Sequence, residues 1–153
     1  MKPRNKLIYL ASPYTHADDA VRYFREQEIC RIAAALKRQG KHAYCPIAET
    51  TSVARHGKLV NTTWEEWRED DLTLLSRCDE IQVAMIDGWN ESRGIRGEVK
   101  FALKNNIPVS FIMYEDADDI ESSDLDINLY FLHGNEKWVL AMFDVNSVDE
   151  LND

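Results

Sequence analysis

The sequence has few cysteines, no long apolar run and no block of basic residues. Its 153 residues include three cysteines, none in a CxxC pair, which predicts neither a disulfide framework nor a thiolate metal site. We expect buried thiols in a reducing compartment. No stretch approaches the roughly 18 apolar residues of a membrane-spanning helix, and the apolar run after Lys6 ends at Ser12 and Pro13, too early for a signal-peptide core. These absences favour a cytoplasmic protein with no membrane partner.

Basic residues are outnumbered by acidic ones because of one part of the chain. The net charge is −9, yet residues 1–114 hold 15 acidic and 17 basic residues, a net of +2, whereas residues 115–153 hold 12 acidic residues and Lys137 alone, a net of −11. Nucleic-acid binding needs a basic face, so we expect no nucleic-acid partner. A small anionic ligand is compatible with the nearly neutral first part.

The composition is that of one folded domain. Hydrophobic residues make up 44% and charged residues 29%, close to globular averages of about 45–50% and 25%. The length of 153 residues matches about one domain. We therefore expect a single domain over 1–153, with a core at about 7–113 and a C-terminal extension at 115–145 that holds an acidic loop and a hairpin or strand pair.

Short apolar segments alternate with longer segments of helical spacing, which is the pattern of a parallel sheet with crossover helices. We expect strands at 7–11, 42–45, 80–86 and 107–113, helices at 15–39, from 62 or 63 to 77 and at 97–105, and loops at 47–60 and 87–96. A capping box of Thr15 and Asp18 is expected to start the first helix. The predicted fold class is α/β, a three-layer sandwich whose parallel sheet has four to five strands.

The C-terminal extension begins with acidic residues. Residues 115–128 hold seven acidic residues and no basic one, as in a solvated loop. Two apolar segments follow, at 129–132 and 138–143. We expect these two segments to form either a hairpin at a sheet edge or a final strand pair used in subunit contact, and the sequence does not decide between the two.

Ligands of open α/β sheets bind at the carboxyl ends of the strands, which directs attention to the loops at 12–16, 46–60 and 87–97. The last loop holds three glycines but neither GxGxxG nor a Walker sequence, so we expect no dinucleotide. The histidines have no paired spacing, so we expect no metal site. The sequence therefore predicts no cofactor.

Two acidic residues are candidates for chemistry. Glu98 is expected in the first turn of the helix that begins at Gly97, where the helix dipole favours an ionised carboxylate that can act as a nucleophile. The alternative is a residue that simply suits a helix start. Asp71 shares a helical face with Trp64 and Trp67, and an acid in such a stripe is suited to proton donation. The alternative is a structural hydrogen bond or ion pair.

Several other side chains are candidate ligand contacts. Arg22 and Arg25 fall on one sector of the first helix and suit recognition of an anion, unless they pair with local acids or extend into water. His16 and His56 lie in the expected site loops, where each is either a ligand contact or a solvated side chain. Trp89 can stack on a base, unless it packs on its own domain.

Four motifs occur in an order that resembles a known family. They lie at the ends of the first two strands, on the second helix and before the third helix: Tyr9-Leu-Ala-Ser-Pro-Tyr14, Pro46-Ile-Ala48, Trp64-x-x-Trp67-x-x-x-Asp71 with Cys78-Asp79-Glu80, and Gly88-Trp89-x-x-Ser92-x-Gly94-x-x-x-Glu98. Over roughly residues 7–113 the chain resembles the nucleoside 2-deoxyribosyltransferase-like family, and within it a bacterial and phage branch.

The resemblance implies a flavodoxin-like, Rossmann-like fold and a double displacement at the anomeric carbon of a 2-deoxynucleoside or its 5′-monophosphate. It implies Glu98 as the nucleophile, Asp71 as the acid that assists departure of the base, Asp87 as a ligand of the sugar or base, and Tyr9 as a hydrogen-bond partner of the nucleophile. The substrate contacts that it implies in the two neighbouring loops are Ser12, Pro13, Tyr14, Ser92 and Gly94. A second base as acceptor makes such an enzyme a transferase, and water makes it an N-glycosidase. The family also implies a homo-oligomer.

Two features depart from the family pattern, and two other functions stay open. The motif at Pro46 continues with Glu49-Thr50-Thr51 where the branch tends to have histidines. Residues 115–153 have no counterpart, although family members often complete their site with a neighbour's C-terminal segment. One alternative function is a non-catalytic module of the same fold that binds or senses a nucleotide. The other is an interaction protein that acts through its acidic C-terminal part.

Overall fold

The computed structural model describes residues 4–59, 63–117 and 127–152. The elements, in chain order, are β1 (Leu7–Ala11), α1 (Asp19–Arg38), β2 (His42–Tyr44), α2 (Pro46–Gly57), α3 (Trp64–Leu75), β3 (Glu80–Ala84), the 3₁₀ helix η1 (Trp89–Glu91), α4 (Arg93–Lys104), β4 (Val109–Asp116), β5 (Ile127–His133), α5 (Glu136–Met142) and the 3₁₀ helix η2 (Val148–Glu150). No helix within these ranges is long and apolar enough to cross a bilayer.

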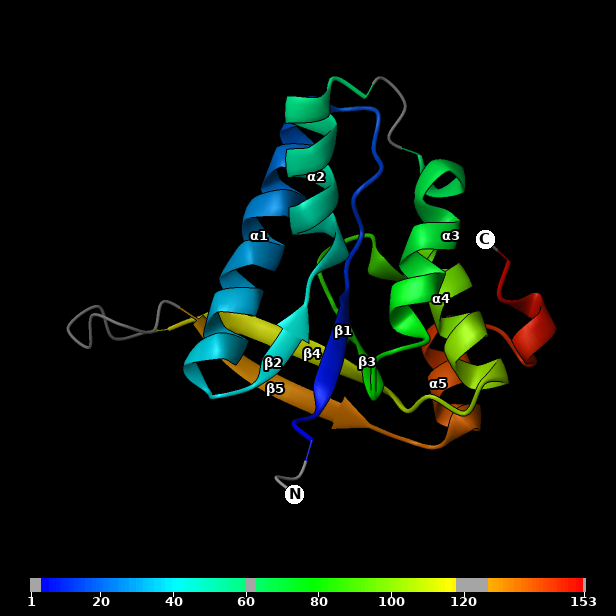
Figure 1. Ribbon diagram of the computed structural model, residues 1–153. Coiled ribbons are helices and arrows are strands. Elements are labelled where there is room, and N and C mark those ends of the chain that lie inside the picture. Colours follow the sequence, from blue (N-terminus) through cyan, green and yellow to red (C-terminus); the bar gives the residue numbers. More distant parts are fainter. Residues whose placement is uncertain (1–3, 60–62, 118–126, 153) are drawn as a thin grey trace.

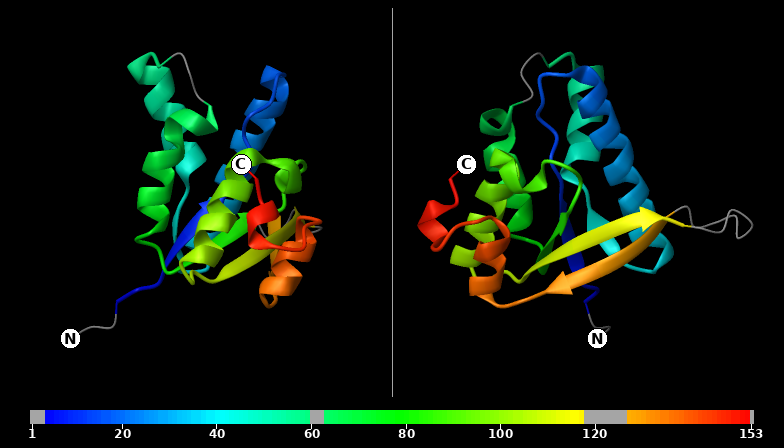
Figure 2. Two further views of the ribbon diagram at one scale, coloured as in Figure 1. Left: turned by 90° about the vertical axis from the view of Figure 1, so that its right-hand side faces the viewer. Right: turned by 180° about the vertical axis from the view of Figure 1, so that it is seen from behind.

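The strands form one sheet in the order β2-β1-β3-β4-β5. β2, β1, β3 and β4 are parallel, and β5 runs antiparallel to β4, as Figure 2 shows for that pair of neighbouring strands. Helices α1 and α2 cover one face of the sheet, and α3, α4 and α5 cover the other (Figure 1). The fold is therefore α/β, with three layers and a mostly parallel sheet, as the alternating pattern predicts.

An apolar core fills each side of the sheet. The core under α3, α4 and α5 contains Tyr9, Phe111 and Phe143, and the core under α1 contains Leu10 and Ile112. Because β1 and β3 lie between these two cores, both of their faces are buried. This position accounts for the apolar character of β1, which lacks polar alternation.

The expected loop at 47–60 is wrong over most of its length, because α2 occupies Pro46–Gly57. Pro46 stands at the first helical position, where its missing N–H costs nothing. The buried face of α2 is made by Pro46, Thr50, Thr51 and Ala54. None of these four residues has a large apolar side chain, so the buried face lacks the stripe of Leu, Ile, Val or Phe by which a helix is usually recognised in a sequence.

Two helix starts also differ from the prediction. Asp18, rather than Thr15, caps α1 and accepts a hydrogen bond from the Ala20 N–H at 2.9 Å. Ser92 caps α4 and accepts from the Ile95 N–H at 3.3 Å. Since α4 begins at Arg93, Glu98 lies in the second turn and not in the first.

The C-terminal part adds one strand and one helix to the domain. Residues 138–143 belong mostly to α5, whose cap Asn135 accepts from the Trp138 N–H at 2.9 Å, so the hairpin or strand pair with 129–132 is wrong. β5 instead pairs with β4 from Ser110 to Asp116. The start and end of the expected acidic loop are therefore strand residues, and residues 118–126 of that loop lie outside the described residues.

A substitution at Phe143 tests whether the C-terminal part of the chain belongs to the core. Its buried ring lies 5.2 Å from the Trp89 ring and 5.9 Å from the Phe111 ring, centroid to centroid. Phe143→Ala is expected to lower the free energy of unfolding by about 3–5 kcal/mol, measured by urea denaturation. Phe24→Ala, at an exposed position of α1, should change it by less than about 1 kcal/mol. Equal effects of the two changes would contradict the shared core.

Candidate active site

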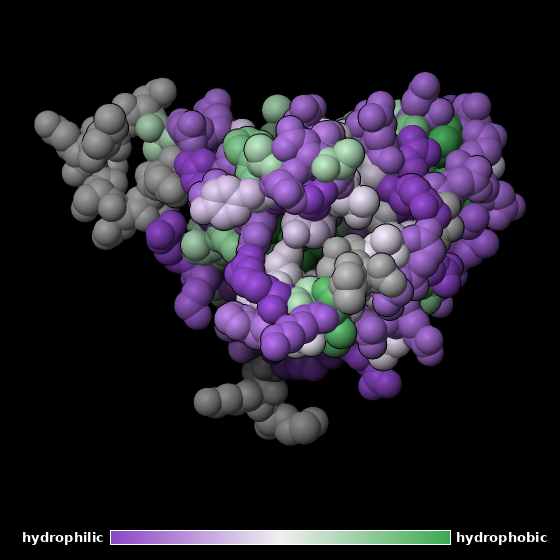
Figure 3. All heavy atoms as spheres, turned by 90° about the horizontal axis from the view of Figure 1, so that it is seen from above, coloured by the Kyte–Doolittle hydropathy of each residue, from purple (hydrophilic) through white to green (hydrophobic). Residues whose placement is uncertain are grey.

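A cavity of about 400 Å³ opens at the carboxyl ends of β1 and β3. β1 leads through α1 to β2 on one side of it, whereas β3 lies on its other side, and such a switch point is where ligands bind in open α/β sheets. The cavity is lined by the turn after β1 and by residues of α2, α3 and α4. Seen from above, it is a hollow in this end of the molecule (Figure 3).

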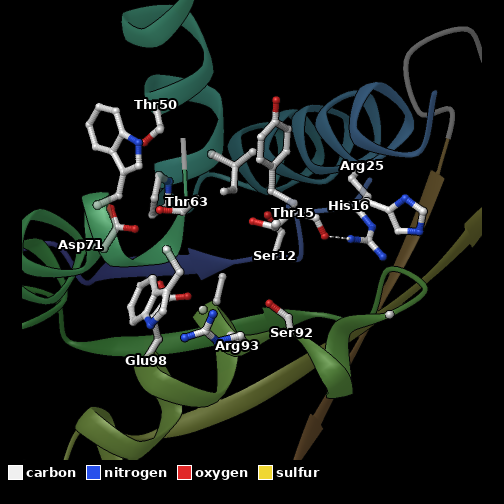
Figure 4. Close-up of a pocket in the computed structure, with 18 of the residues that line it drawn as sticks. Ser12, Thr15, His16, Arg25, Thr50, Thr63, Asp71, Ser92, Arg93 and Glu98 are labelled. Atoms are coloured by element: carbon white, nitrogen blue, oxygen red, sulfur yellow. Dashed lines mark hydrogen bonds between the residues drawn. The ribbon is translucent and has the colours of Figure 1, made fainter. Parts of the chain in front are cut away.

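Two buried carboxyl groups enter the cavity from the helices on one side. Asp71 comes from α3 and Glu98 from the neighbouring α4, and Figure 4 shows both at the same end of the cavity. Their residues are only 8% and 5% exposed. Asp71 is buried on the same face of α3 as Leu75, so the helical spacing assigns its face correctly.

The surroundings favour the protonated form of both acids. Burial raises the pKa of Asp71 to about 7, and the charges of Asp70 and Glu49 act in the same direction. Burial and the charge of Asp71 raise the pKa of Glu98 well above its ordinary value. Two buried carboxyl groups that interact in this way titrate as a pair that retains a proton near neutral pH. Such a pair can supply one carboxylate and one carboxylic acid.

Tyr9 lies beneath this pair in the core. Burial, and then the charge of the neighbouring Glu98, raises the pKa of the Tyr9 hydroxyl. This hydroxyl in turn acts to lower the pKa of Glu98 against the larger effect of burial, although the contact falls short of full hydrogen-bond geometry. In the sheet, Tyr9 pairs with Tyr44 of β2, and the two ring centroids are 6.2 Å apart. The Tyr44 hydroxyl donates to Glu49 of α2. Tyr9 and Tyr44 thus lie between Glu98 and Glu49, the acid whose charge contributes to the raised pKa of Asp71.

The opposite end of the cavity is rich in hydrogen-bond donors. Arg25 donates to the Thr15 carbonyl at 2.9 Å and to the Asp87 carbonyl at 3.2 Å, and it lies with Ser12 and His16 at this end (Figure 4). A Cβ atom on Gly88 would lie 2.4 Å from the Arg25 Nη2 atom. Glycine therefore makes room for the guanidinium.

Three residues that line the cavity each have a buried polar atom without a hydrogen-bond partner among the described residues. These atoms are the Ser12 hydroxyl, the Arg25 Nε atom and the Trp67 Nε1 atom. All three carry a hydrogen that can be donated, and a buried donor without an acceptor is unfavourable. The cavity is therefore suited to a ligand with several acceptor atoms.

Several residues expected at the site line the cavity. Besides the two acids, they are Ser12, Tyr14, Arg25, Ser92 and Gly94. His16 also lines the cavity, whereas the sequence left a solvated loop position as the alternative.

Besides Tyr9, which lies beneath the two acids, five residues expected at the site do not line the cavity. Trp89 packs on Phe111 and Phe143, with centroids 5.4 and 5.2 Å away, so it does not stack on a ligand. Arg22 donates to the His16 carbonyl and pairs with Asp19. The remaining three are the buried Pro13, the exposed His56 in the last turn of α2, and the exposed Asp87, which meets Arg25 through its backbone carbonyl.

Other residues of the lining are absent from the sequence prediction. Ile47 and Thr50 enter from α2, which the sequence pattern does not reveal as a helix. Arg93 of α4 forms an ion pair with Glu65 of α3, and both line the cavity. The opposite charges of these two residues are visible in the sequence and are compatible with an ion pair. Whether the two residues meet depends on how α3 packs against α4.

Among residues 4–59, 63–117 and 127–152, no three His, Cys, Asp or Glu side chains gather closely enough to hold a metal ion. A comparison with protein-family models gives a match over residues 6–115 to the family described as "Domain of unknown function (DUF1937)". A comparison with curated proteins gives no match. Every residue of the cavity lies inside the matched range.

Glu49→Gln is expected to lower the pKa of Asp71, because it removes a negative charge that opposes ionisation of that carboxyl. The Asp71 side-chain carboxyl carbon can be followed by NMR as a function of pH. Glu66→Gln, at an exposed position of α3, is the matched control and should leave the titration unchanged. An equal shift in both variants would show that Glu49 has no special influence.

Asp71→Asn is expected to stabilise the protein more at high pH than at low pH. The pKa of Asp71 rises from 3.8 to about 7 on folding, so the folded state binds the proton more tightly. Stability then falls as pH rises from about 4 to 7, and the full cost applies above pH 7. We expect Asn to raise the free energy of unfolding by about 2–4 kcal/mol more at pH 8.5 than at pH 4. A urea-measured difference that is independent of pH would contradict the buried carboxyl.

Proposed function

The chain belongs to the DUF1937 family, described as a domain of unknown function, and we propose that it is an enzyme that cleaves or exchanges the N-glycosidic bond of a 2-deoxynucleoside or its 5′-monophosphate. The observation that carries this proposal is the pair of buried carboxyl groups, Asp71 and Glu98, in one cavity at the switch point of the sheet. Displacement at an anomeric carbon through a covalent intermediate needs one carboxylate and one carboxylic acid within a single site.

In the proposed first step, ionised Glu98 attacks C1′ of the sugar. A C1′–O bond forms as the C1′–N bond breaks, the electron pair of the broken bond passes to the base nitrogen, and protonated Asp71 delivers its proton to the base. In the second step, water or a second base forms a bond to C1′ as the C1′–O bond to Glu98 breaks, and ionised Asp71 takes the proton that the attacking group loses. Glu98 is released as a carboxylate. Water gives an N-glycosidase, and a second base gives a deoxyribosyltransferase.

Tyr9 supports the ionised nucleophile in this scheme. Its unpartnered hydroxyl lies beside Glu98 and lowers the pKa of that carboxyl. A donor held there favours the charged form against the larger effect of burial. In this scheme, substrate fills the cavity and the proton shared by the two acids moves to Asp71. Glu98 is then ionised and can attack C1′.

The two ends of the cavity suit the two ends of a nucleoside. Trp64 and Trp67 line the cavity from the same helix as Asp71, and indole rings suit contact with a base. Ser12, His16 and Arg25 lie at the other end, where donors suit the oxygens of a 5′ group. A volume of about 400 Å³ is within the range of small-molecule sites.

Fold and motif order give further support. The strand order β2-β1-β3-β4-β5 is that of a flavodoxin-like doubly wound sheet, with the antiparallel β5 as a departure. Of the four motifs that resemble the nucleoside 2-deoxyribosyltransferase-like family, three carry Tyr9, Asp71 and Glu98, and these residues lie close enough to interact. A homo-oligomer, which that resemblance also implies, is part of the same proposal.

The competing function is a nucleotide-binding or sensing module without catalysis. The raised pKa of Glu98 favours it, because a protonated carboxyl can donate a hydrogen bond to a ligand but is a poor nucleophile.

Glu98→Gln separates the two functions. Purified protein is incubated with dAMP or deoxyinosine, with and without free adenine, and the products are separated by chromatography. The enzyme should release or exchange the base, and Glu98→Gln should lose activity by roughly 10³-fold or more while its thermal melting temperature is kept. Glu66→Gln should keep full activity. Undiminished turnover by Glu98→Gln would refute the proposed nucleophile, and tight binding without base release would favour the sensing module.

A further inference from the structure

A second cleft, of about 430 Å³, lies at the other end of the sheet. It is bordered by the segments that enter β1, β2 and β3 and by the last residues of β5, on the face covered by α1. It shares no lining residue with the candidate active site. Any ligand of this cleft is therefore a separate question from the proposed reaction.

A row of polar residues crosses the sheet beside this cleft. Gln82 of β3 is in register with Ser110 of β4, which is in register with His133 of β5, so the three side chains lie on one face. Gln82 and His133 line the cleft. Gln82 is 4% and Ser110 1% exposed, and polar residues at such depth in central strands are unusual.

Two atoms of this row have no hydrogen-bond partner in the part of the chain that the structure describes. The Gln82 Nε2 atom donates to Glu80 at 2.8 Å, but the Gln82 Oε1 atom accepts no hydrogen bond, and the Ser110 hydroxyl is also unpartnered. Buried polar groups are normally satisfied by protein, water or ligand. The Gln82 carbonyl needs a donor, and the Ser110 hydroxyl can donate or accept.

One cation of the cleft is available for a ligand. The Lys6 ammonium is paired with Glu80 at 2.9 Å. The Lys41 ammonium instead lies 3.5 Å from the centroid of the Phe131 ring and has no ion pair with an acid in the described ranges. The carboxylate that acts on Lys41 electrostatically, that of Glu80, is already paired with Lys6. A cation held over an aromatic ring in this way suits an anionic group.

We propose that this cleft binds a small organic anion that also carries a hydroxyl or amino group. The anionic group pairs with Lys41, and the hydroxyl or amino hydrogen is donated to Gln82, next to the Ser110 hydroxyl. Phosphate monoesters and hydroxy acids share this chemistry, and the size of the cleft suits either class.

Four probes separate the two required groups: glycerol 3-phosphate, glycerate, inorganic phosphate and glycerol. Each is titrated into the ¹⁵N-labelled full chain while the Gln82 side-chain amide and the Ser110 and His133 backbone amides are followed by NMR. Saturable shifts with glycerol 3-phosphate or glycerate, at least about tenfold tighter than with inorganic phosphate or glycerol, support the site and identify the source of the anion. Equal affinities for inorganic phosphate and the organic anions, or no shifts at all, overturn it.

Lys41→Met tests the anion contact and keeps an apolar side chain against Phe131. It should weaken binding of the best probe by about tenfold or more. Lys37→Met, at an exposed position in the last turn of α1, should bind as the unchanged protein does. Equal binding by the two variants would refute the role of Lys41.

Gln82→Met and Ser110→Ala test whether the polar row serves a ligand or the fold. Removing an unpartnered buried polar group should leave the ligand-free melting temperature unchanged or raise it by about 2–4 °C, while probe binding is lost. A lower melting temperature in both variants with probe binding intact would assign the row a structural role and overturn the proposal. Neither result depends on Glu98 or on any assay of base release.

Discussion

The removal of two carboxyl groups from water is the constraint on which the rest of the candidate site depends. α3 packs against α4 and brings Asp71 and Glu98 into one cavity, where the two groups cannot both be ionised at low cost. The site therefore retains a proton, and the Tyr9 hydroxyl beneath it is free to donate. Ionisable groups buried in this way lower stability, and proteins keep them mainly where chemistry requires them.

Strand β1 connects this constraint to the fold. Buried on both faces, it carries Tyr9 below the carboxyl pair and leads directly into Ser12 at the donor-rich end of the cavity. Both ends of β1 border clefts, one at the candidate active site and the other at Lys6 and Ile8. Apolar residues of β1, β3 and β4 fill the two cores, and unpartnered polar atoms lie beside the two clefts. Burial of the apolar residues supplies the stability that the unpartnered polar atoms cost.

Periodicity predicts elements well where the buried residues are large and apolar. β1, β3 and the buried face of α3 follow from such patterns. α2 does not, because Thr50, Thr51 and Ala54 form its buried face, and α5 is short enough that Trp138 to Phe143 resembles a strand. The start of α4 depends on the Ser92 cap, a local hydrogen bond that the glycines of the preceding loop obscure. Moving that start by four residues places Glu98 in the second turn, where burial outweighs the helix dipole.

Local sequence was sufficient for the α/β class and for the helical face of Asp71, because each depends on the spacing of neighbouring residues. The order of short motifs was sufficient to place Glu98 at the cavity, although the expected first-turn position was wrong. Local sequence was not sufficient for the membership of the cavity. Arg25 reaches the cavity through Gly88 and the Thr15 and Asp87 carbonyls, whereas Trp89 turns into the core because Phe143, from the far end of the chain, is there to receive it. Contacts between distant segments, and the loss of water that accompanies them, arise only when the chain has folded.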